Sequence, residues 1–337
     1  RRSLASGLVE ELASAREEHG LEVDLFLYRN VHSINADLPS SAWRWSGGEP
    51  PDHVDSMVGH LEEPKDGVLA SHRLVIAPTQ FSTTAPLKVM APRLGFRAAT
   101  MPGFSPAMVP ALRLDSTEVN RRVMLLKHFL DDRVGADFRF LVDATDEHEL
   151  HLDLRHREAH ASGGLLPNPG TAGNLPSGEA YIVPYEGEIE GDSTSSKGSM
   201  PVQFGDEVVI YRIEENKAVA VLSSGPESER EAAYIRDEPA YANLSELGLG
   251  VLGDFGLKPT GTILLDEKLG LHVAFGRSDH FGGQVGPGDF SSPDAVVHID
   301  RVYIPEVQPA VHVASLTLDM PEGPREVMKD GAWTGVF

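Results

Sequence analysis

The 337-residue chain contains no cysteine. This absence excludes disulfide bonds, thiolate nucleophiles, iron–sulfur clusters and cysteine-ligated zinc. Any metal must therefore be held by nitrogen and oxygen ligands. Basic residues are also scarce, with 29 Lys and Arg against 51 Asp and Glu and a formal net charge of −22. Because phosphate-bearing partners bind through clustered Lys and Arg, we expect neither a nucleic-acid nor a membrane partner.

Long apolar runs are missing as well. No stretch approaches the roughly 18 apolar residues of a membrane span, and the first ten residues hold two arginines and a glutamate but no apolar segment of the secretory kind. We therefore expect a soluble, cytoplasmic protein. Three catalytic signatures are also absent, namely the GxSxG elbow, the HExxH helix and a phosphate loop ending in GK[ST]. The acidic surface is expected to act mainly as a solubilising feature.

The length and the 41% hydrophobic content favour two domains with ordinary cores. Residues 3–18 have helical spacing, residues 21–28 and 74–78 read as strands, and residues 38–66 read as a loop. A helix capped by Ser82 or Thr83 and ended by Gly95 precedes a strand at 96–100, which predicts a parallel βαβ unit. After a helix at 115–135, the pattern changes. We predict an amino-terminal α/β domain at residues 1–140.

Residues 141–337 are predicted to form a β-rich, α+β metal-binding domain. Strands are expected at residues 138–142, 150–154, 181–184, 208–213, 218–222, 262–265 and 271–275. The Gly- and Pro-rich stretch at 163–178 is expected to be an ordered loop that leads directly to Glu179. The histidines of the alternating segment at 147–154 are expected to face solvent.

The segment from Val296 to Asp300 carries the clearest chemical signal. If it is a strand, its period of two places His298 and Asp300 on one face, while Val297 and Ile299 point to the other. An imidazole and a carboxylate then converge, which suits Zn²⁺, Mn²⁺, Co²⁺ or Fe²⁺.

Three further candidates lie in apolar or glycine-bounded segments: Glu179, Glu246 and His272. A lone charge in such surroundings is costly unless it is paired or bound to a cation. Each alone has an ordinary interpretation, since a glutamate at a strand end is usually solvated and a strand histidine usually forms only hydrogen bonds. Asp279 and His280, in the glycine-rich connection before His298, could supply a further ligand or a proton-transfer group.

These segments together resemble the M29 family of metallo-aminopeptidases, the aminopeptidase T or thermophilic aminopeptidase group, which is of one superfamily with 2,5-dihydroxypyridine dioxygenase. The likeness covers roughly residues 70–335 and rests on residues 173–184, 245–250, 260–268, 271–276, 281–283 and 298–300. The resemblance implies a two-domain homodimer acting on a peptide or small amide, with two divalent ions, Zn, Co or Mn, per chain. It implies as metal ligands Glu179, Glu246, His272, His298 and Asp300.

In such an enzyme a metal-activated water would attack the scissile carbonyl and release amino-terminal residues. Glu179, Glu246 or His280 would carry the catalytic proton, and the residue types leave their roles open. Arg277, Lys268 and Asp279 are possible substrate contacts, although Lys268 is equally well explained as an ion-pair partner of neighbouring acids. The family commonly has a tyrosine shortly after the first histidine, where this chain has Asp279 and His280.

Two alternatives remain open. One is a mononuclear non-haem Fe(II) ring-cleaving dioxygenase of the 2,5-dihydroxypyridine dioxygenase type, in which a histidine is expected in place of Glu246. The other is an M29-like hydrolase of an unusual amide. A third interpretation, a relative without catalysis that binds a small ligand, is disfavoured by the intact ligand residues. The carboxylate at position 246 favours hydrolysis.

Overall fold

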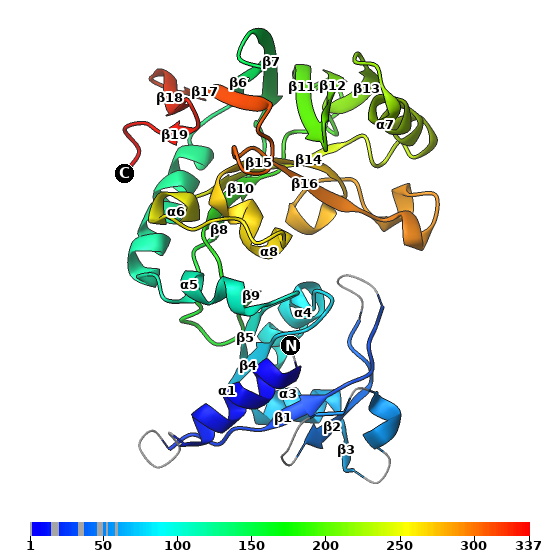
Figure 1. The fold of residues 1–337 in the computed structure, drawn as a ribbon, viewed down its shortest axis with the longest axis vertical. Coiled ribbons are helices and arrows are strands. Elements are labelled where there is room, and N and C mark those ends of the chain that lie inside the picture. Colours follow the sequence, from blue (N-terminus) through cyan, green and yellow to red (C-terminus); the bar gives the residue numbers. More distant parts are fainter. Residues whose placement is uncertain (1, 15–19, 33–36, 46–49, 52, 58–59) are drawn as a thin grey trace. The chain divides into compact units, whose positions relative to one another are not determined.

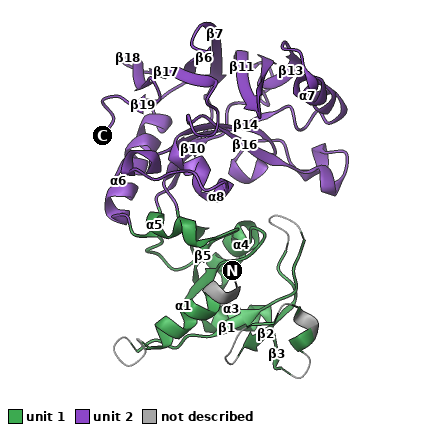
Figure 2. Cartoon of the chain, in the orientation of Figure 1, with its two compact units in different colours: residues 1–113, 164–176 green, residues 114–163, 177–337 purple. Residues whose placement is uncertain are grey.

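The computed structural model describes residues 2–14, 20–32, 37–45, 50–51, 53–57 and 60–337. The chain divides into two compact units, one of residues 1–113 and 164–176 and the other of residues 114–163 and 177–337 (Figure 2). The first division falls after Arg113 rather than near residue 140. The reason is that the helix Ser116–Asp131, which follows Arg113, packs on the strands His160–Ser162 and Glu179–Ile182 of the second unit.

Unit 1 contains two three-stranded sheets, with orders β1-β2-β3 and β4-β5-β9 (Figure 1). Its described helices and strands are α1 (Arg2–Ser14), β1 (Leu25–Leu27), β2 (Ser41–Trp45), β3 (Glu62–Pro64), α3 (Lys65–Ser71), β4 (Leu74–Ala77), α4 (Thr84–Leu94), β5 (Arg97–Thr100), α5 (Val109–Leu112) and β9 (Ala172–Asn174). Strands β4, β5 and β9 are parallel, and β1 to β3 are antiparallel. The predicted βαβ unit, β4-α4-β5, is therefore confirmed.

Helix α4 has the boundaries that its sequence predicts. Thr83 is the N-cap residue, and Gly95 ends the helix with a left-handed φ of 79° that few other residues tolerate. The apolar side of α4 packs into a core cluster of Leu69, Leu87, Met90, Ala91, Phe96 and Ala98. This core holds the parallel sheet together.

Two predictions for unit 1 are wrong. The expected loop at 38–66 contains β2 and β3, which pair with each other beside β1. Strand β4 is an edge strand with Leu74 and Ile76 exposed, not a buried one. The stretch at 163–178 is an ordered loop, as predicted, except for the three residues of β9, which pair with β5; residues 164–176 belong to unit 1.

Unit 2 contains a five-stranded sheet, β16-β15-β14-β10-β8, and an eight-stranded sheet, β13-β12-β11-β7-β6-β17-β18-β19, both antiparallel. Its helices and strands are α6 (Ser116–Asp131), β6 (Gly135–Val142), β7 (Asp146–Asp153), β8 (His160–Ser162), β10 (Glu179–Ile182), β11 (Lys197–Phe204), β12 (Glu207–Glu214), β13 (Lys217–Val221), α7 (Pro226–Asp237), β14 (Leu244–Gly250), α8 (Ile263–Asp266), β15 (Leu271–Gly276), β16 (His298–Val302), β17 (Val311–Met320), β18 (Gly323–Lys329) and β19 (Ala332–Trp333). The predicted sequence of a parallel α/β part followed by a β-rich part is confirmed.

Helix α6 covers β8 and β10, and α7 covers β12 and β13 (Figure 1). The Asp115 side chain caps α6 by accepting hydrogen bonds from the backbone N–H of Thr117 and Glu118, at 2.9 and 3.3 Å. The strand predicted at 262–265 is wrong, because that segment forms the short helix α8. Among the described helices, none is both long and apolar enough to cross a membrane.

Candidate metal centre

The five predicted ligands lie on four neighbouring strands of the five-stranded sheet in unit 2. Glu179 begins β10, Glu246 lies in β14, and His272 lies in β15, while β16 carries both His298 and Asp300. Across the strands Gly248 pairs with His272, Ala274 with Asp300, and Gly276 with His298. Because paired residues of an antiparallel ladder share a face, all five side chains project from one face of the sheet.

The opposite face is apolar. Leu247, Val273 and Phe275 alternate with the candidate ligands and are fully buried. This alternation fixes the register, since a slip of one residue would move every ligand into the core and every core side chain into the site. The ligand face is thus positioned by ordinary hydrophobic burial.

Small residues opposite the ligands leave them space. A Cβ atom added at Gly248 would lie 1.9 Å from Nε2 of His272, so the imidazole occupies the room that a side chain would need. Ala274 and Gly276 take the corresponding positions beside Asp300 and His298. The glycines of the run at 248–250 therefore serve the site directly.

Glu246 lies between the two imidazoles. Its Oε1 is 3.5 Å from Nε2 of His272, and its Oε2 is 3.0 Å from Nε2 of His298. Nε2 of His298 is also 3.5 Å from Oδ1 of Asp300. On its other side, Nδ1 of His298 lies 2.8 Å from the carbonyl oxygen of Arg277, to which it donates. A backbone carbonyl at one ring nitrogen directs the other nitrogen to the site, as in metal-ligating histidines.

Glu179 is held by a fully buried lysine. Nζ of Lys268 lies 3.2 Å from Oε1 of Glu179 and also contacts Glu267. Oε2 of Glu179 is 3.8 Å from Nε2 of His272. Lys268, which the sequence offered as a substrate contact or an ion-pair partner, lies in ion pairs and has no exposed surface. It orients Glu179 and offsets buried negative charge.

In the metal-free protein, the carboxylates and imidazoles of the cluster shift one another's pKa values. Burial would lower the pKa of His272, but its hydrogen bond with Glu246 and the nearby charges of Asp300 and Glu246 raise that pKa to about 9. Burial would raise the pKa of Glu246, but His272 and His298 lower it to about 2. The pKa of His298 is raised well above its usual value, and that of Asp300 is lowered, by their mutual attraction against the cost of burial. Two imidazolium rings thus neutralise carboxylates in the metal-free protein.

The donor set fits divalent cations. Glu179, Glu246 and His272 form one group whose ligand atoms lie within 4.8 Å of one another, and Glu246, His298 and Asp300 form a second. Oε2 of Glu179 and Nδ1 of His272 are buried and have no hydrogen-bond partner among the described residues. A cation at the first group would satisfy the free Glu179 oxygen, and imidazole with carboxylate is a set that Zn²⁺, Co²⁺, Mn²⁺ and Fe²⁺ accept.

The segment after β15 brings His280 to the edge of this site. The ring of His280 lies 5.3 Å from that of His298, edge to face. Burial, together with the charges of His298 and Arg277, lowers the pKa of His280 to about 4, so its ring is neutral at neutral pH. Arg277 and Asp279, the other predicted substrate contacts, form an ion pair with each other at 2.5 Å.

Two residues near the site were missed by sequence reasoning. Glu267 lies beside Lys268, and burial with the charges of Glu179 and Asp300 raises its pKa to about 8. Tyr181 follows Glu179 by two residues and pairs with Gly248, so it shares the ligand face. Burial and the charges of Glu246 and Glu179 raise the pKa of Tyr181. The strand period of two from Glu179 could have placed Tyr181 on the ligand face. The position of Glu267 next to Lys268, in an apolar segment, could have identified it as a buried acid.

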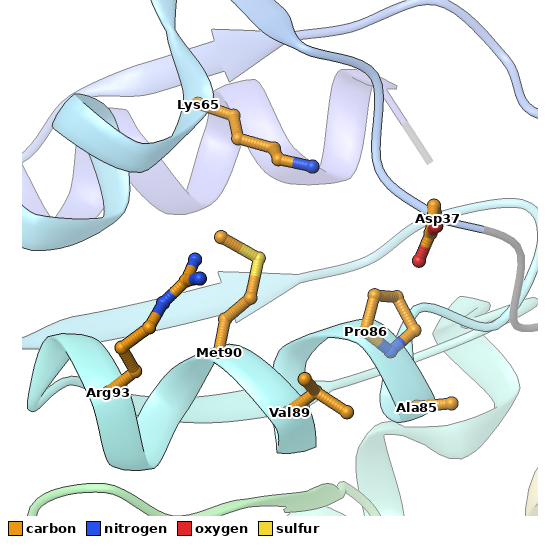
Figure 3. Close-up of a pocket in the computed structure, with 7 residues that line it drawn as sticks. All are labelled: Asp37, Lys65, Ala85, Pro86, Val89, Met90 and Arg93. Carbon is orange, nitrogen blue, oxygen red and sulfur yellow. The ribbon is translucent and has the colours of Figure 1, made fainter.

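Two other features of the described chain stand apart from this centre. Asp137, His151 and Asp319 form a partly exposed group on β6, β7 and β17. His151, predicted to face solvent, is half-buried and hydrogen-bonds to Asp137 at 2.8 Å. In unit 1, α4 and residues Asp37 and Lys65 line a cavity of about 220 Å³ (Figure 3). That cavity contains none of the predicted ligands.

A methyl group at position 248 is expected to disrupt the centre. The Gly248→Ala side chain would collide with the His272 ring, because the added Cβ would be 1.9 Å from Nε2. Loss of a contact that supports a ligand typically lowers metal affinity about 10- to 100-fold. We expect a larger fall here, because a ligand itself is displaced. Equilibrium dialysis measures this loss. Gly67→Ala is the control, since its Cβ meets no atom within 4 Å, and equal metal affinity in both variants would contradict the assignment.

Metal affinity is expected to rise with pH. His272 is protonated below about pH 9 in the metal-free protein, and a cation binds only the neutral ring. Apparent affinity should therefore increase about tenfold per pH unit for each proton released, up to about pH 9. Isothermal titration calorimetry in buffers of different ionisation enthalpy measures that release, and binding near neutral pH without any release would contradict it.

The stability of the metal-free protein has the opposite dependence on pH. The pKa of His272 is about 9 in the folded chain against the ordinary value of 6.5. Its contribution to stability is therefore complete below pH 6.5 and is lost as pH rises through 9. Chemical denaturation of metal-free protein across this window measures the loss.

The fold and this centre together define a mixed α/β protein with a buried cluster of carboxylates and imidazoles of the composition that divalent metals bind. No protein-family model matches the chain, and no curated protein matches it. Among solved structures, it is similar to 2,5-dihydroxypyridine dioxygenase from Pseudomonas putida KT2440, with a TM-score of 0.57 and 15% identity over 80% of this chain and 74% of that one. Wild-type AmpT from Thermus thermophilus aligns with a TM-score of 0.42 and 17% identity, over 65% of this chain and 55% of that one. The likeness to the dioxygenase is one of fold.

Proposed function

We propose that this protein is a metal-dependent hydrolase with a two-metal centre, and specifically an aminopeptidase that releases amino-terminal residues from peptides or small amides. The observation that carries the proposal is the position of Glu246. This carboxylate belongs both to the group with Glu179 and His272 and to the group with His298 and Asp300. A carboxylate shared by two adjacent ligand groups is typical of paired divalent ions that lie about 3.5–4 Å apart.

Ions bound by these residues would lower the pKa of water and polarise a carbonyl oxygen. The chain's own groups would then orient the reactants and move protons. Lys268 holds Oε1 of Glu179 at 3.2 Å, which leaves Oε2 free to face the centre. Glu246 and Glu179 are the carboxylates within reach of an attacking water, and one of them would accept its proton.

The leaving amine needs a proton donor or a hydrogen-bond partner at the edge of the site. His280 is neutral at neutral pH and lies against His298, so it can form a hydrogen bond with the amine but holds no imidazolium proton to transfer to it. The Tyr181 hydroxyl forms no hydrogen bond with any described residue, and its ring is fixed between His160 and Phe281 at 5.1 and 4.8 Å. We assign Tyr181 to contact with the substrate carbonyl, in the role of the tyrosine that the M29 pattern has elsewhere.

A second candidate is a mononuclear Fe(II) dioxygenase. Nε2 of His272 and Nε2 of His298 lie 3.5 and 3.0 Å from the two oxygens of Glu246. Two histidines and one carboxylate are also the ligand set of a single Fe(II) ion. The solved structure with the higher similarity is that of 2,5-dihydroxypyridine dioxygenase. In this alternative Glu179 would remain an ion-pair partner of Lys268 rather than a ligand.

Metal counting and a substrate panel distinguish the two functions. Metal-free protein is loaded separately with Zn²⁺, Co²⁺, Mn²⁺ and, without oxygen, Fe²⁺, and bound ions are counted by mass spectrometry. Each form is then assayed with aminoacyl nitroanilides, short peptides and 2,5-dihydroxypyridine. The proposal expects about two ions per chain and release of amino-terminal residues.

One iron per chain with turnover of 2,5-dihydroxypyridine would establish the alternative instead. Glu246→His supplies a further comparison, because it adds the histidine of the mononuclear pattern and removes the shared carboxylate. This variant should lose the second ion if the centre is dinuclear. Binding of no divalent ion by the wild-type chain would reject both functions. A homodimer is also part of the proposal, and light scattering of the full chain tests it.

A further inference from the structure

A second cavity in unit 2 lies where α6 leads into β6 and where the chain leaves β7. Its volume is about 560 Å³, and none of the candidate metal ligands contributes to it. The lining residues are Asp131, Arg133, Val134, Leu154, Arg155, His156, Arg157 and Glu158. Three arginines from two separate segments thus meet at one hollow of an otherwise acidic protein.

Arg133 is the unusual member of this lining. Only 4% of the residue is exposed, and its Nε and Nη2 atoms are buried without a hydrogen-bond partner among the described residues. Arg133 also forms no ion pair within 4.0 Å of a carboxylate in the described part of the chain, although the nearby charges of Asp131 and Asp132 favour its charged form. The remaining nitrogen, Nη1, is not among the buried unpartnered atoms and is therefore the one open to the cavity.

The other charged side chains around the cavity have partners. Arg155 pairs with Asp153 at 2.7 Å, and Arg157 contacts Glu188 and lies 3.5 Å from Glu186. The remaining pairs join His156 to Asp192 at 2.9 Å and Lys127 to Asp131 at 2.6 Å and Glu158 at 3.9 Å. The Arg157 Nε atom is a further buried donor without a partner. Among the charged side chains around the cavity, Arg133 and Arg157 are therefore the ones with donors that lack an acceptor among the described residues.

A structural role at the end of α6 does not account for Arg133. A cation two residues beyond Asp131 is favourable to the helix dipole. Such a role normally includes hydrogen bonds to the last carbonyl oxygens of the helix, and Arg133 makes none with the described residues. Burial lowers the pKa of Arg133 to about 10, so the guanidinium keeps its charge at neutral pH.

A buried guanidinium without a partner costs free energy that folding alone does not recover. Guanidinium groups donate only, and Nη1 of Arg133, which is open to the cavity, can donate a charge-assisted hydrogen bond to an oxygen of a carboxylate or a phosphate. We propose that this cavity is a binding site for a small oxyanion, a carboxylate or phosphate group of a small molecule, with Arg133 as its principal contact. The site is separate from the metal centre and does not depend on the proposed function.

The test compares anion-dependent stabilisation of wild-type protein, Arg133→Met and Arg139→Met. Metal is removed beforehand with a chelating resin, because a soluble polycarboxylate chelator would itself compete for the site. Thermal unfolding is followed with inorganic phosphate or succinate at constant ionic strength set by chloride. Arg139 is the matched control, since it lies on β6 with an exposed side chain.

At an anion concentration about 100 times Kd, the melting temperature of the wild type should rise by about 4 °C. Arg139→Met should show the same rise, and Arg133→Met should show none. A response to phosphate alone or to succinate alone would identify the class of ligand. Equal responses of the wild type and Arg133→Met, or no response of the wild type to either anion, would overturn the proposal.

Removal of the Arg133 charge should also change the melting temperature of the protein when no anion is added. Arg133→Met should melt at a higher temperature than the wild type, because an apolar chain fills the volume without a buried charge. A structural arginine would give the opposite result, and a lower melting temperature would therefore contradict the inference. Arg133→Lys keeps the charge but places the donor at a different position, so its shift with phosphate should lie between those of the wild type and Arg133→Met.

Discussion

The Glu246→Gln protein is expected to lose metal at both ligand groups. Glu246 is the carboxylate that the Glu179–His272 group and the His298–Asp300 group share. A neutral amide leaves the shape of the side chain unchanged but removes the charge that lies 3.5 and 3.0 Å from the two imidazoles. We expect affinity at both positions to fall by more than about 100-fold, which exceeds the usual cost of losing a supporting contact. Metal counting after dialysis measures this loss.

Two comparison variants make this result specific. His298→Gln changes only the second group, so the protein should keep one ion with Glu179, Glu246 and His272. Glu190→Gln makes the same chemical change at an exposed position and should keep both ions. If Glu246→Gln bound two ions as tightly as the wild type, the carboxylate would not be shared and the two-metal proposal would fail.

The Lys268→Met protein is expected to be strongly destabilised without metal. Lys268 is fully buried and lies against Glu179 and Glu267, and methionine would leave these carboxylates without a cation. Removal of one member of a buried ion pair costs about 3–5 kcal/mol. For a chain of this size the melting temperature should fall by about 4–7 °C. Thermal unfolding of metal-free protein measures the change.

Added metal should restore part of the stability of Lys268→Met, because a divalent cation supplies the positive charge that the lysine provided. Lys258→Met is the control, since that lysine pairs with Glu306 and is 76% exposed. An exposed pair contributes less than about 1 kcal/mol, so this variant should melt near the wild type. If Lys268→Met melted at the same temperature as the wild type, the ion pairs of Lys268 with Glu179 and Glu267 would not contribute to stability.

Local patterns predicted several elements correctly. The residues at the ends of α4 and α6 act locally, since Gly95 ends α4 through its left-handed backbone and Asp115 caps α6 through its side chain. The spacing of His298 and Asp300 placed both on one face of a strand, as β16 has them. These features depend on residues a few positions apart, and such residues are adjacent whatever the rest of the chain does.

Predictions that depended on distant neighbours were less successful. Residues 262–265 read as a strand, yet they form the start of α8, which contacts the short 3-10 helix Glu267–Leu269. The segment at 38–66 was rich in turn residues, yet β2 and β3 pair within it. The boundary near residue 140 assigned α6 to the first unit, whereas the partners of α6 are β8 and β10. In each case tertiary packing outweighed local propensity.

The sequence by itself determined the chemistry available to this protein, because the absence of cysteine limits metal ligands to nitrogen and oxygen. It also determined, through alternation, which side chains share a face within one strand. Only the tertiary structure decided that Gly248 lies opposite His272, that Glu246 serves two ligand groups, and that Lys268 holds Glu179. The physical reason is that register across strands is set by burial of the whole sheet, a property that no single segment contains.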